Sequence, residues 1–258
     1  MTRIISIIGG KGGVGKTTLT SNLACALADI GHNVVAIDAN LTTPNLGLHL
    51  GMHLSPKTLH HVLKNEARLS EAMYPHPFGF KVVPGSMAVK DLEGLDVSNL
   101  AAVPLSLVGQ ADYVLLDCAA GLGREAVSGL DAADETILIT NPDLPSLTDA
   151  LKTATIAEAS QKRVLGVVVN RVKGKWHEVS NRDIEEMLGV PVLAEIPEDR
   201  SIQQSISLKM PLVGYDPYSP ASEQFKRLAH YISGKPYIEL KRNTGVTFLQ
   251  KLIQWMVG

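Results

Sequence analysis

The feature that most constrains the fold is the glycine-rich stretch "GGKGGVGKTT", residues 9–18. It follows the apolar run Ile4–Ile8 and precedes leucines at helical spacing. The pattern Gly-x-x-x-x-Gly-Lys-Thr between a strand and a helix predicts a phosphate-binding loop. Backbone N–H groups and the positive end of the helix dipole favour phosphate oxygens there. The nucleotide-binding residues predicted from this loop are Gly10, Lys11, Gly12, Gly13, Val14, Gly15, Lys16, Thr17 and Thr18.

Two side chains of the loop have predicted roles of their own. Lys16 is expected to reach the β- and γ-phosphates, and the Thr17 hydroxyl is a suitable ligand for Mg²⁺. The basic pattern needs one lysine, but this loop also carries Lys11. The loop therefore predicts a site for Mg²⁺ and a nucleotide such as ATP, and it leaves the role of Lys11 open.

Along the rest of the chain, short β-branched runs alternate with longer helical patterns. This order predicts an α/β fold with a doubly wound, mostly parallel β-sheet flanked by helices. The predicted strands are Ile4–Ile8, Val34–Asp38, Lys81–Val83, Tyr113–Asp117, Thr136–Thr140, Val164–Asn170 and Pro191–Ala194. The predicted helices are the segment that ends before Gly31, and Asp149–Ser160, Asn181–Leu188 and Ser222–Ile232. The segment 88–111 is left unassigned, because Pro104 interrupts a helical pattern.

The composition limits the classes of protein. The 258 residues are 45% apolar, which is enough for one large domain, and the formal net charge of −2 gives no overall basic field for DNA. Cys25 and Cys118 lie far apart and form no CxxC motif. No segment resembles a signal peptide or approaches the roughly 18 apolar residues of a transmembrane helix. We therefore expect a cytoplasmic protein, with DNA not expected among its partners.

Two aspartates end predicted strands. Asp38 ends Val34–Asp38, and Asp117 ends Tyr113–Asp117. Open α/β sheets bind ligands at the carboxyl ends of their strands, so both carboxylates and the phosphate loop are predicted to converge on one Mg²⁺-nucleotide. A single aspartate after an apolar run is more often a turn or a helix cap. The agreement of three elements is what favours a metal site formed by Thr17, Asp38 and Asp117.

The segment "KGGVGKTT" resembles the deviant Walker A motif of the MinD/ParA family of ATPases, and the chain is most similar to the MinD branch in an archaeal style. Further stretches that carry the resemblance are "VVAIDANLTTPNLGLHLG", "YVLLDCAAGLG", "ETILITNPDLPSLTDALK", "VLGVVVNR" and "IPEDRSIQQSISLKMPLV". Together they run from residue 4 to about residue 213, which is most of the chain.

The resemblance implies roles for further residues. Lys11 would reach across an ATP-bound homodimer to the phosphates of the partner, and Asn170 would hydrogen-bond the edge of adenine. Arg171 and the segment Pro197-Glu198-Asp199 would flank the base. From the spacing alone, Lys11 as a solvated loop residue and Asn170 as a strand-end cap remain alternatives.

The chain departs from the family at Asn40. Family members usually carry an acidic residue two positions after the first aspartate, where it helps to position the attacking water. Asn40 carries no charge and cannot act as a base. We therefore expect slow ATP hydrolysis and a long-lived dimer, with Lys11, Lys16, Asp38, Asn40 and Asp117 as the catalytic set.

The C-terminus predicts a separate element. We divide the chain into an ATPase domain at 1–233, a linker at 234–245 and an amphipathic helix at 246–258. The polar residues of this helix share one sector, and its apolar face suits the headgroup region of an anionic membrane. The alternative is a helix that packs on its own core or on a partner protein. The residues predicted to contact the membrane are Phe248, Leu249, Leu252, Ile253, Trp255 and Met256.

Together these features predict a MinD-like ATPase. ATP would drive dimerisation and reversible binding to the inner face of the cell membrane, and the protein would position the division apparatus or another cellular machine with an activating or cargo protein. One alternative is a ParA-like partition ATPase that binds DNA nonspecifically, which needs a basic stripe. The other is a slowly hydrolysing, nucleotide-gated scaffold, which Asn40 motivates.

Overall fold

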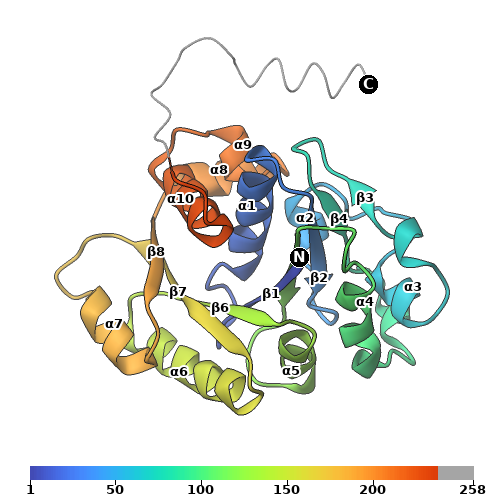
Figure 1. Cartoon of the computed structure of the whole chain (residues 1–258), viewed down its shortest axis with the longest axis horizontal. Helices are drawn as coiled ribbons and strands as arrows, with labels where there is room; N and C mark the ends of the chain where they lie inside the picture. Colours follow the sequence, from blue (N-terminus) through green and yellow to red (C-terminus); the bar gives the residue numbers. More distant parts are fainter. Residues whose placement is uncertain (238–258) are drawn as a thin grey trace, which may run out of the picture.

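The computed structural model describes residues 1–237, and within that range the strands form one eight-stranded sheet in the order β3-β4-β2-β5-β1-β6-β7-β8 (Figure 1). All neighbouring strands are parallel except β3 and β4. The strands are β1 (Arg3–Ile8), β2 (Val34–Ala39), β3 (Tyr74–Pro75), β4 (Lys81–Val83), β5 (Tyr113–Cys118), β6 (Glu135–Thr140), β7 (Arg163–Val172) and β8 (Val192–Pro197). The predicted doubly wound α/β fold is confirmed.

Helices cover both faces of this sheet (Figure 1). One layer contains α1 (Lys16–Asp29), α2 (Leu46–His49), α9 (Leu212–Tyr215) and α10 (Pro220–Ser233), next to α8 (Arg200–Ser207). The other layer contains α3 (Leu59–Leu63), α4 (Ala102–Leu105), α5 (Arg124–Asp131), α6 (Leu144–Ala159) and α7 (Asn181–Leu188). Short 3₁₀ turns lie at η1 (Leu69–Glu71), η2 (Val89–Leu92) and η3 (Val97–Ala101).

The central strands are apolar on both sides because both sides are covered. In β1, Ile5 and Ile7 pack into the core beneath α1 and α10, whereas Ile4 and Ile8 pack into the core beneath α6. All four side chains are at most 3% exposed. This arrangement holds the end of β1, where the phosphate loop begins, between two apolar layers.

Several predicted boundaries were wrong, and the reasons are local. Helix α6 begins at Leu144 rather than Asp149, because Asp143 caps it by accepting a hydrogen bond from the Ser146 N–H and because Pro145 is tolerated in a first helical turn. The last strand, β8, begins one residue after Pro191 and continues to Pro197. The segment 88–111 forms η2, η3 and α4, and Pro104 lies inside the short α4.

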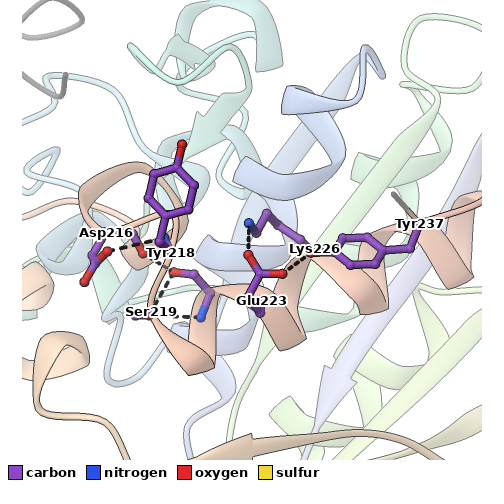
Figure 2. A network of polar contacts seen from close by, with 7 residues as sticks. Asp216, Tyr218, Ser219, Glu223, Lys226 and Tyr237 are labelled. Atoms are coloured by element: carbon purple, nitrogen blue, oxygen red, sulfur yellow. Dashed lines mark hydrogen bonds and ion pairs between the residues drawn. The ribbon is translucent and has the colours of Figure 1, made fainter. Parts of the chain in front are cut away.

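The end of the described chain is held against α10 (Figure 2). Helix α10 ends at Ser233, and its C-cap, Gly234, adopts the left-handed conformation. The Tyr237 hydroxyl then contacts the Glu223 carboxylate, which also pairs with Lys226. The Tyr237 ring lies 4.9 Å from the Arg227 guanidinium carbon. Residues 234–237, where the predicted linker 234–245 begins, therefore lie against α10. The membrane helix predicted at 246–258 lies outside the described residues.

Within residues 1–237, no helix is both long enough and apolar enough to span a bilayer.

Candidate functional site

The phosphate loop joins the end of β1 to the start of α1. Its last residue, Gly15, is the N-cap of α1 with φ 109° and ψ 20°, and no side chain caps the helix. The first turn of α1 contains no acidic residue. The N–H groups at the start of α1 are therefore oriented towards the loop with no side-chain acceptor from the cap, which suits an anion.

Two glycines of the loop are required by close packing. A Cβ on Gly10 would lie 2.3 Å from the backbone oxygen of Asp149 in α6, and a Cβ on Gly15 would lie 2.2 Å from the Asn170 Nδ2 in β7. Apart from the adjoining residues of the loop, no atom of residues 1–237 lies within 4 Å of the corresponding positions on Gly12 and Gly13. The loop is thus packed on one side by α6 and β7 and open on the other.

The two lysines of the loop have different environments. Lys16 is 7% exposed, and its Nζ lies 3.4 Å from the Lys11 carbonyl oxygen. Burial lowers the pKa of Lys16, while the nearby Asp117 carboxylate acts to raise it. The Lys11 side chain is exposed on the open side of the loop. Lys16 is placed to act within its own site, and Lys11 faces outwards.

Asp38 and Asp117 lie opposite each other in the register between β2 and β5. Both are almost completely buried, with 0% and 1% of their surface exposed. The Asp38 Oδ2 accepts a hydrogen bond of 2.9 Å from the Leu46 N–H. The Asp38 Oδ1 and the Asp117 Oδ2 have no hydrogen-bond partner among the described residues. Buried carboxylate oxygens normally have partners, so these two oxygens require an explanation.

The two negatively charged carboxylates repel one another. Burial raises the pKa of Asp38 well above its usual value, and the nearby charge of Asp117 raises it further. Burial also raises the pKa of Asp117 to about 6, although the Thr17 hydroxyl and the Lys16 ammonium partly offset this effect. A divalent cation would remove the repulsion and satisfy both oxygens.

The donor set fits Mg²⁺. Two carboxylates and the Thr17 hydroxyl, which acts to lower the pKa of Asp117, are hard oxygen donors beside the phosphate loop. Within residues 1–237, no group of three His, Cys, Asp or Glu side chains is placed to hold a metal ion by itself. Thr17, Asp38 and Asp117 would hold the ion, which would supply positive charge next to the phosphates.

The loop after β2 is held by contacts that the sequence did not reveal. The Asn40 Nδ2 donates to the Thr43 carbonyl oxygen at 2.6 Å, and the Thr43 hydroxyl donates to the Asn40 Oδ1 at 3.1 Å. Asn40 is therefore closed within its own loop. The buried His60 Nε2 lies 3.0 Å from the Leu41 oxygen, and its Nδ1 accepts from the Ser86 N–H at 3.0 Å. Gly85 packs against the same loop. A Cβ placed on Gly85 would lie 3.5 Å from the Asp38 Cγ.

A second unexpected contact joins the same loop to α5. The Glu125 carboxylate accepts hydrogen bonds from the Thr42 N–H at 2.9 Å and from the Thr42 hydroxyl at 2.7 Å. No local spacing rule links residues 83 positions apart that follow two different strands. An acidic residue in the first turn of a helix was the available signal.

The residues predicted for the base lie next to the phosphate loop. Asn170 is 6% exposed, and its Nδ2 donates to the Val14 carbonyl at 2.7 Å. Arg171 has a positive φ of 59° and donates to the Gly13 carbonyl at 2.9 Å. Both therefore brace the loop from β7. Contact between Asn170 and adenine stays a prediction, for which the Oδ1 remains available in addition to the bonded Nδ2.

The segment Pro197-Glu198-Asp199 connects β8 to α8. Pro197 is the last residue of β8, and Glu198 pairs with Lys173 at 3.1 Å. Asp199 is the N-cap of α8, where it accepts from the Ser201 N–H at 2.8 Å. The structure places this segment beside the end of β7, because the Glu198 N–H donates to the Val172 carbonyl at 2.9 Å. Its contact with a base stays a prediction.

Comparison with known proteins agrees with this geometry. Residues 5–212 match the family described as the CobQ/CobB/MinD/ParA nucleotide binding domain. A curated relative, an uncharacterised ATP-binding protein of Methanocaldococcus jannaschii, is 38% identical over 92% of this chain and 90% of its own length. The chain therefore belongs to the MinD/ParA family of P-loop ATPases.

Two solved structures are similar over nearly the whole described chain. The cell division ATPase MinD of Pyrococcus furiosus is 39% identical, with a TM-score of 0.88 over 91% of this chain and 99% of that chain. The septum site-determining protein MinD of Pyrococcus horikoshii, solved with Mg-ADP, is 38% identical, with a TM-score of 0.87 over 90% and 96% of the two chains. Within the family, the fold is that of MinD.

Proposed function

We propose that this protein is a MinD-like ATPase switch, in which ATP drives dimerisation and dimerisation drives reversible membrane binding. The observation that carries the proposal is the pair of buried carboxylates beside the phosphate loop, Asp38 and Asp117, each with an unpartnered oxygen. The likeness to a MinD solved with Mg-ADP supports Mg²⁺ and an adenine nucleotide as the ligands.

The groups around the phosphate loop have separate roles in the proposed reaction. The N–H groups at the start of α1 bind phosphate oxygens, and the buried Lys16 places its ammonium against them. When bound, Mg²⁺ would supply positive charge beside the phosphates. Asp38 and Asp117, which are register partners near the ends of β2 and β5, would hold the ion. The reaction is hydrolysis of ATP to ADP and phosphate.

Lys11 would complete the site of a partner subunit. Its side chain is exposed on the open side of the loop, whereas Lys16 is enclosed. A cation brought in by a second subunit stabilises charge on the transferred phosphoryl group only in the dimer. By linkage, ATP then favours the dimer and the dimer favours ATP.

Slow turnover is part of the proposal. Asn40 has no charge, and both ends of its amide are bonded to Thr43. It therefore leaves the attacking water without a carboxylate at this position. We expect ATP-bound dimers to outlast many encounters with the membrane, until an activating or cargo protein accelerates hydrolysis.

The membrane step rests on the sequence of the C-terminal segment. Its apolar face and the neighbouring Lys241 and Arg242 suit anionic headgroups. One short helix binds weakly and two in a dimer bind more tightly, so ATP would control attachment through avidity. The cytoplasmic, inner-face location follows from this step. The process that the protein positions is division or the placement of another cellular machine.

Liposome co-sedimentation tests the proposal. Full-length protein and a truncation ending at Asn243 are mixed with anionic vesicles in ATP, ADP or no nucleotide. We expect only full-length protein to pellet, most strongly with ATP. Leu249→Glu on the apolar face should abolish pelleting, whereas Gln250→Glu on the polar face is the matched control.

Dimerisation has its own control. Lys11→Ala should prevent both the ATP-dependent dimer and ATP-enhanced pelleting but keep nucleotide binding, whereas the exposed Lys175→Ala should keep all three. Pelleting of full-length protein that does not depend on nucleotide, or ATP-dependent binding to random DNA without lipid binding, would contradict the proposal. The second result would favour the ParA-like alternative.

A further inference from the structure

The Thr42–Glu125 contact joins the loop that follows Asp38 to the helix α5 that follows Asp117. Thr42 lies in the loop after β2, four residues beyond Asp38, and Glu125 lies in the first turn of α5, eight residues beyond Asp117. Both Glu125 oxygens are used, one by the Thr42 N–H and one by the Thr42 hydroxyl. This is a two-point, charge-assisted contact, which fixes orientation as well as distance.

Glu125 is held where it can make this contact. It lies in the first turn of α5, whose N-cap is Gly123 and has no side-chain cap, so the helix dipole favours a carboxylate there. The loop at residues 40–45 carries no charged side chain of its own. Asn40, the uncharged residue two positions after Asp38, is closed on Thr43. The carboxylate that contacts this loop from outside comes from α5.

The remaining contacts of the loop explain why one link matters. On its inner side the loop is bonded to fixed groups: Leu46 to Asp38, and Leu41 to His60. On its outer side Thr42 and Glu125 are exposed or half-buried, so their contact stabilises the loop rather than the core. Loops of this kind in P-loop proteins become ordered when the γ-phosphate and Mg²⁺ are bound.

We propose that Glu125 is a positioning residue that couples the loop at 40–45 to the start of α5, so that both loops respond together to the γ-phosphate. The inference rests on the proposed ATPase function. Glu125 acts through Thr42 and not on the water or the phosphates. Its effect is therefore on the rate of hydrolysis and on loop order, and not on nucleotide affinity.

Steady-state phosphate release and binding of a fluorescent ADP provide the first test. Glu125→Ala should lower kcat about tenfold and change ADP affinity less than about twofold. Glu125→Gln keeps an acceptor for the Thr42 N–H and places an amide donor against the Thr42 hydroxyl, so it should retain kcat within about threefold. Thr42→Val should lower kcat, and adding it to Glu125→Ala should cause little further loss. Glu158→Ala, at an exposed position on α6, is the matched control.

Hydrogen exchange at the Thr42 amide provides a second test that needs no turnover. Exchange should quicken about tenfold in Glu125→Ala and less than about threefold in Glu125→Gln, with Glu158→Ala unchanged. Three results would overturn the proposal: Glu125→Gln losing as much activity as Glu125→Ala, additive losses in the double variant, or unchanged exchange in Glu125→Ala. If the wild type hydrolyses no ATP, the proposed function fails, and the exchange result still decides the role of Glu125.

Discussion

Buried carboxylates lie at both ends of the strands of the sheet, but within residues 1–237 only those at the amino ends are paired with cations. At the amino edge, Glu135 begins β6 and lies between the first residues of its neighbours, at 2.6 Å from the Arg3 Nε and 3.1 Å from the Arg163 Nη1. Arg3 also donates to the Ile232 carbonyl at the end of α10. At the carboxyl edge, Asp38 and Asp117 are more deeply buried, and each keeps one oxygen without a partner in the part of the chain that the structure describes.

This difference in pairing suggests that the Glu135 cluster stabilises the fold and that the Asp38–Asp117 pair serves to bind a ligand. The Glu135 cluster ties together β1, β6, β7 and α10 with charges that compensate one another. The aspartate pair repels itself, and Lys16 offsets the charge of Asp117 only in part. An arrangement that costs stability in the free protein is expected where a ligand later supplies the missing charge. Neutralising the two edges should therefore have effects of opposite sign.

Asp117→Asn should have the largest effect. It removes a charge that would hold Mg²⁺ in the proposed site, so phosphate release should fall at least about 100-fold. Glu135→Gln changes the same kind of group on the opposite edge and should keep the rate within about twofold. Steady-state phosphate release on both variants measures the comparison. Equal losses would erase the distinction between the edges.

The free energy of unfolding without ligand should show the opposite order. In EDTA at pH 7, Asp117→Asn should raise it by roughly 2 kcal/mol, because the pKa of Asp117 is about 6 in the folded protein against an ordinary value of 3.8. Glu135→Gln should lower it by about 1–2 kcal/mol, because it weakens two charge-assisted hydrogen bonds. Urea denaturation checks both values.

The stability difference between the wild type and Asp117→Asn should depend on pH. Since the pKa of Asp117 is raised on folding, the folded protein binds a proton there more readily than the unfolded chain. Lowering the pH through about 6 towards 4 therefore removes the penalty, and the advantage of Asp117→Asn should shrink towards zero. The same urea titration at several pH values tests this. An advantage that grows on acidification would contradict the sign.

Gly85→Ala should have the smallest effect and sharpens the comparison at the carboxyl edge. The added Cβ would lie 2.4 Å from the Pro44 Cβ, so the loop after β2 must shift. We expect a loss of about 1 kcal/mol in the free energy of unfolding, together with weaker binding of Mg-ADP. Glu135→Gln should lose stability without losing affinity. Thermal unfolding and calorimetric titration separate the two cases.

Much of the fold follows from local pattern. The phosphate loop and the strands that end in Asp38 and Asp117 were predictable, because apolar runs and turn glycines are local signals. Their proximity was predictable too, since carboxyl ends of parallel strands share one edge. The binding roles of these residues stay predictions. Helix α6 was predicted to begin at Asp149 rather than Leu144, although its first turn accepts Pro145.

The rest depends on contacts between distant residues. Glu125 and Thr42 are brought together by the pairing of β2 with β5, which no local pattern encodes. Gly85 matters only because Pro44 packs against it, and two residues of β3 are too short a strand to show periodicity. Asn40 was identified as a departure from the family. Its two hydrogen bonds to Thr43 depend on the conformation of the loop, which the sequence pattern does not encode.

The most direct test of the central claim is the rise in unfolding temperature that saturating Mg-ADP causes, measured relative to EDTA for the wild type, Asp117→Asn and Glu135→Gln. If the carboxyl edge is the Mg²⁺-nucleotide site, the wild type and Glu135→Gln should rise by similar amounts and Asp117→Asn by much less. An equal rise in Asp117→Asn, or a rise lost in Glu135→Gln instead, would contradict the account.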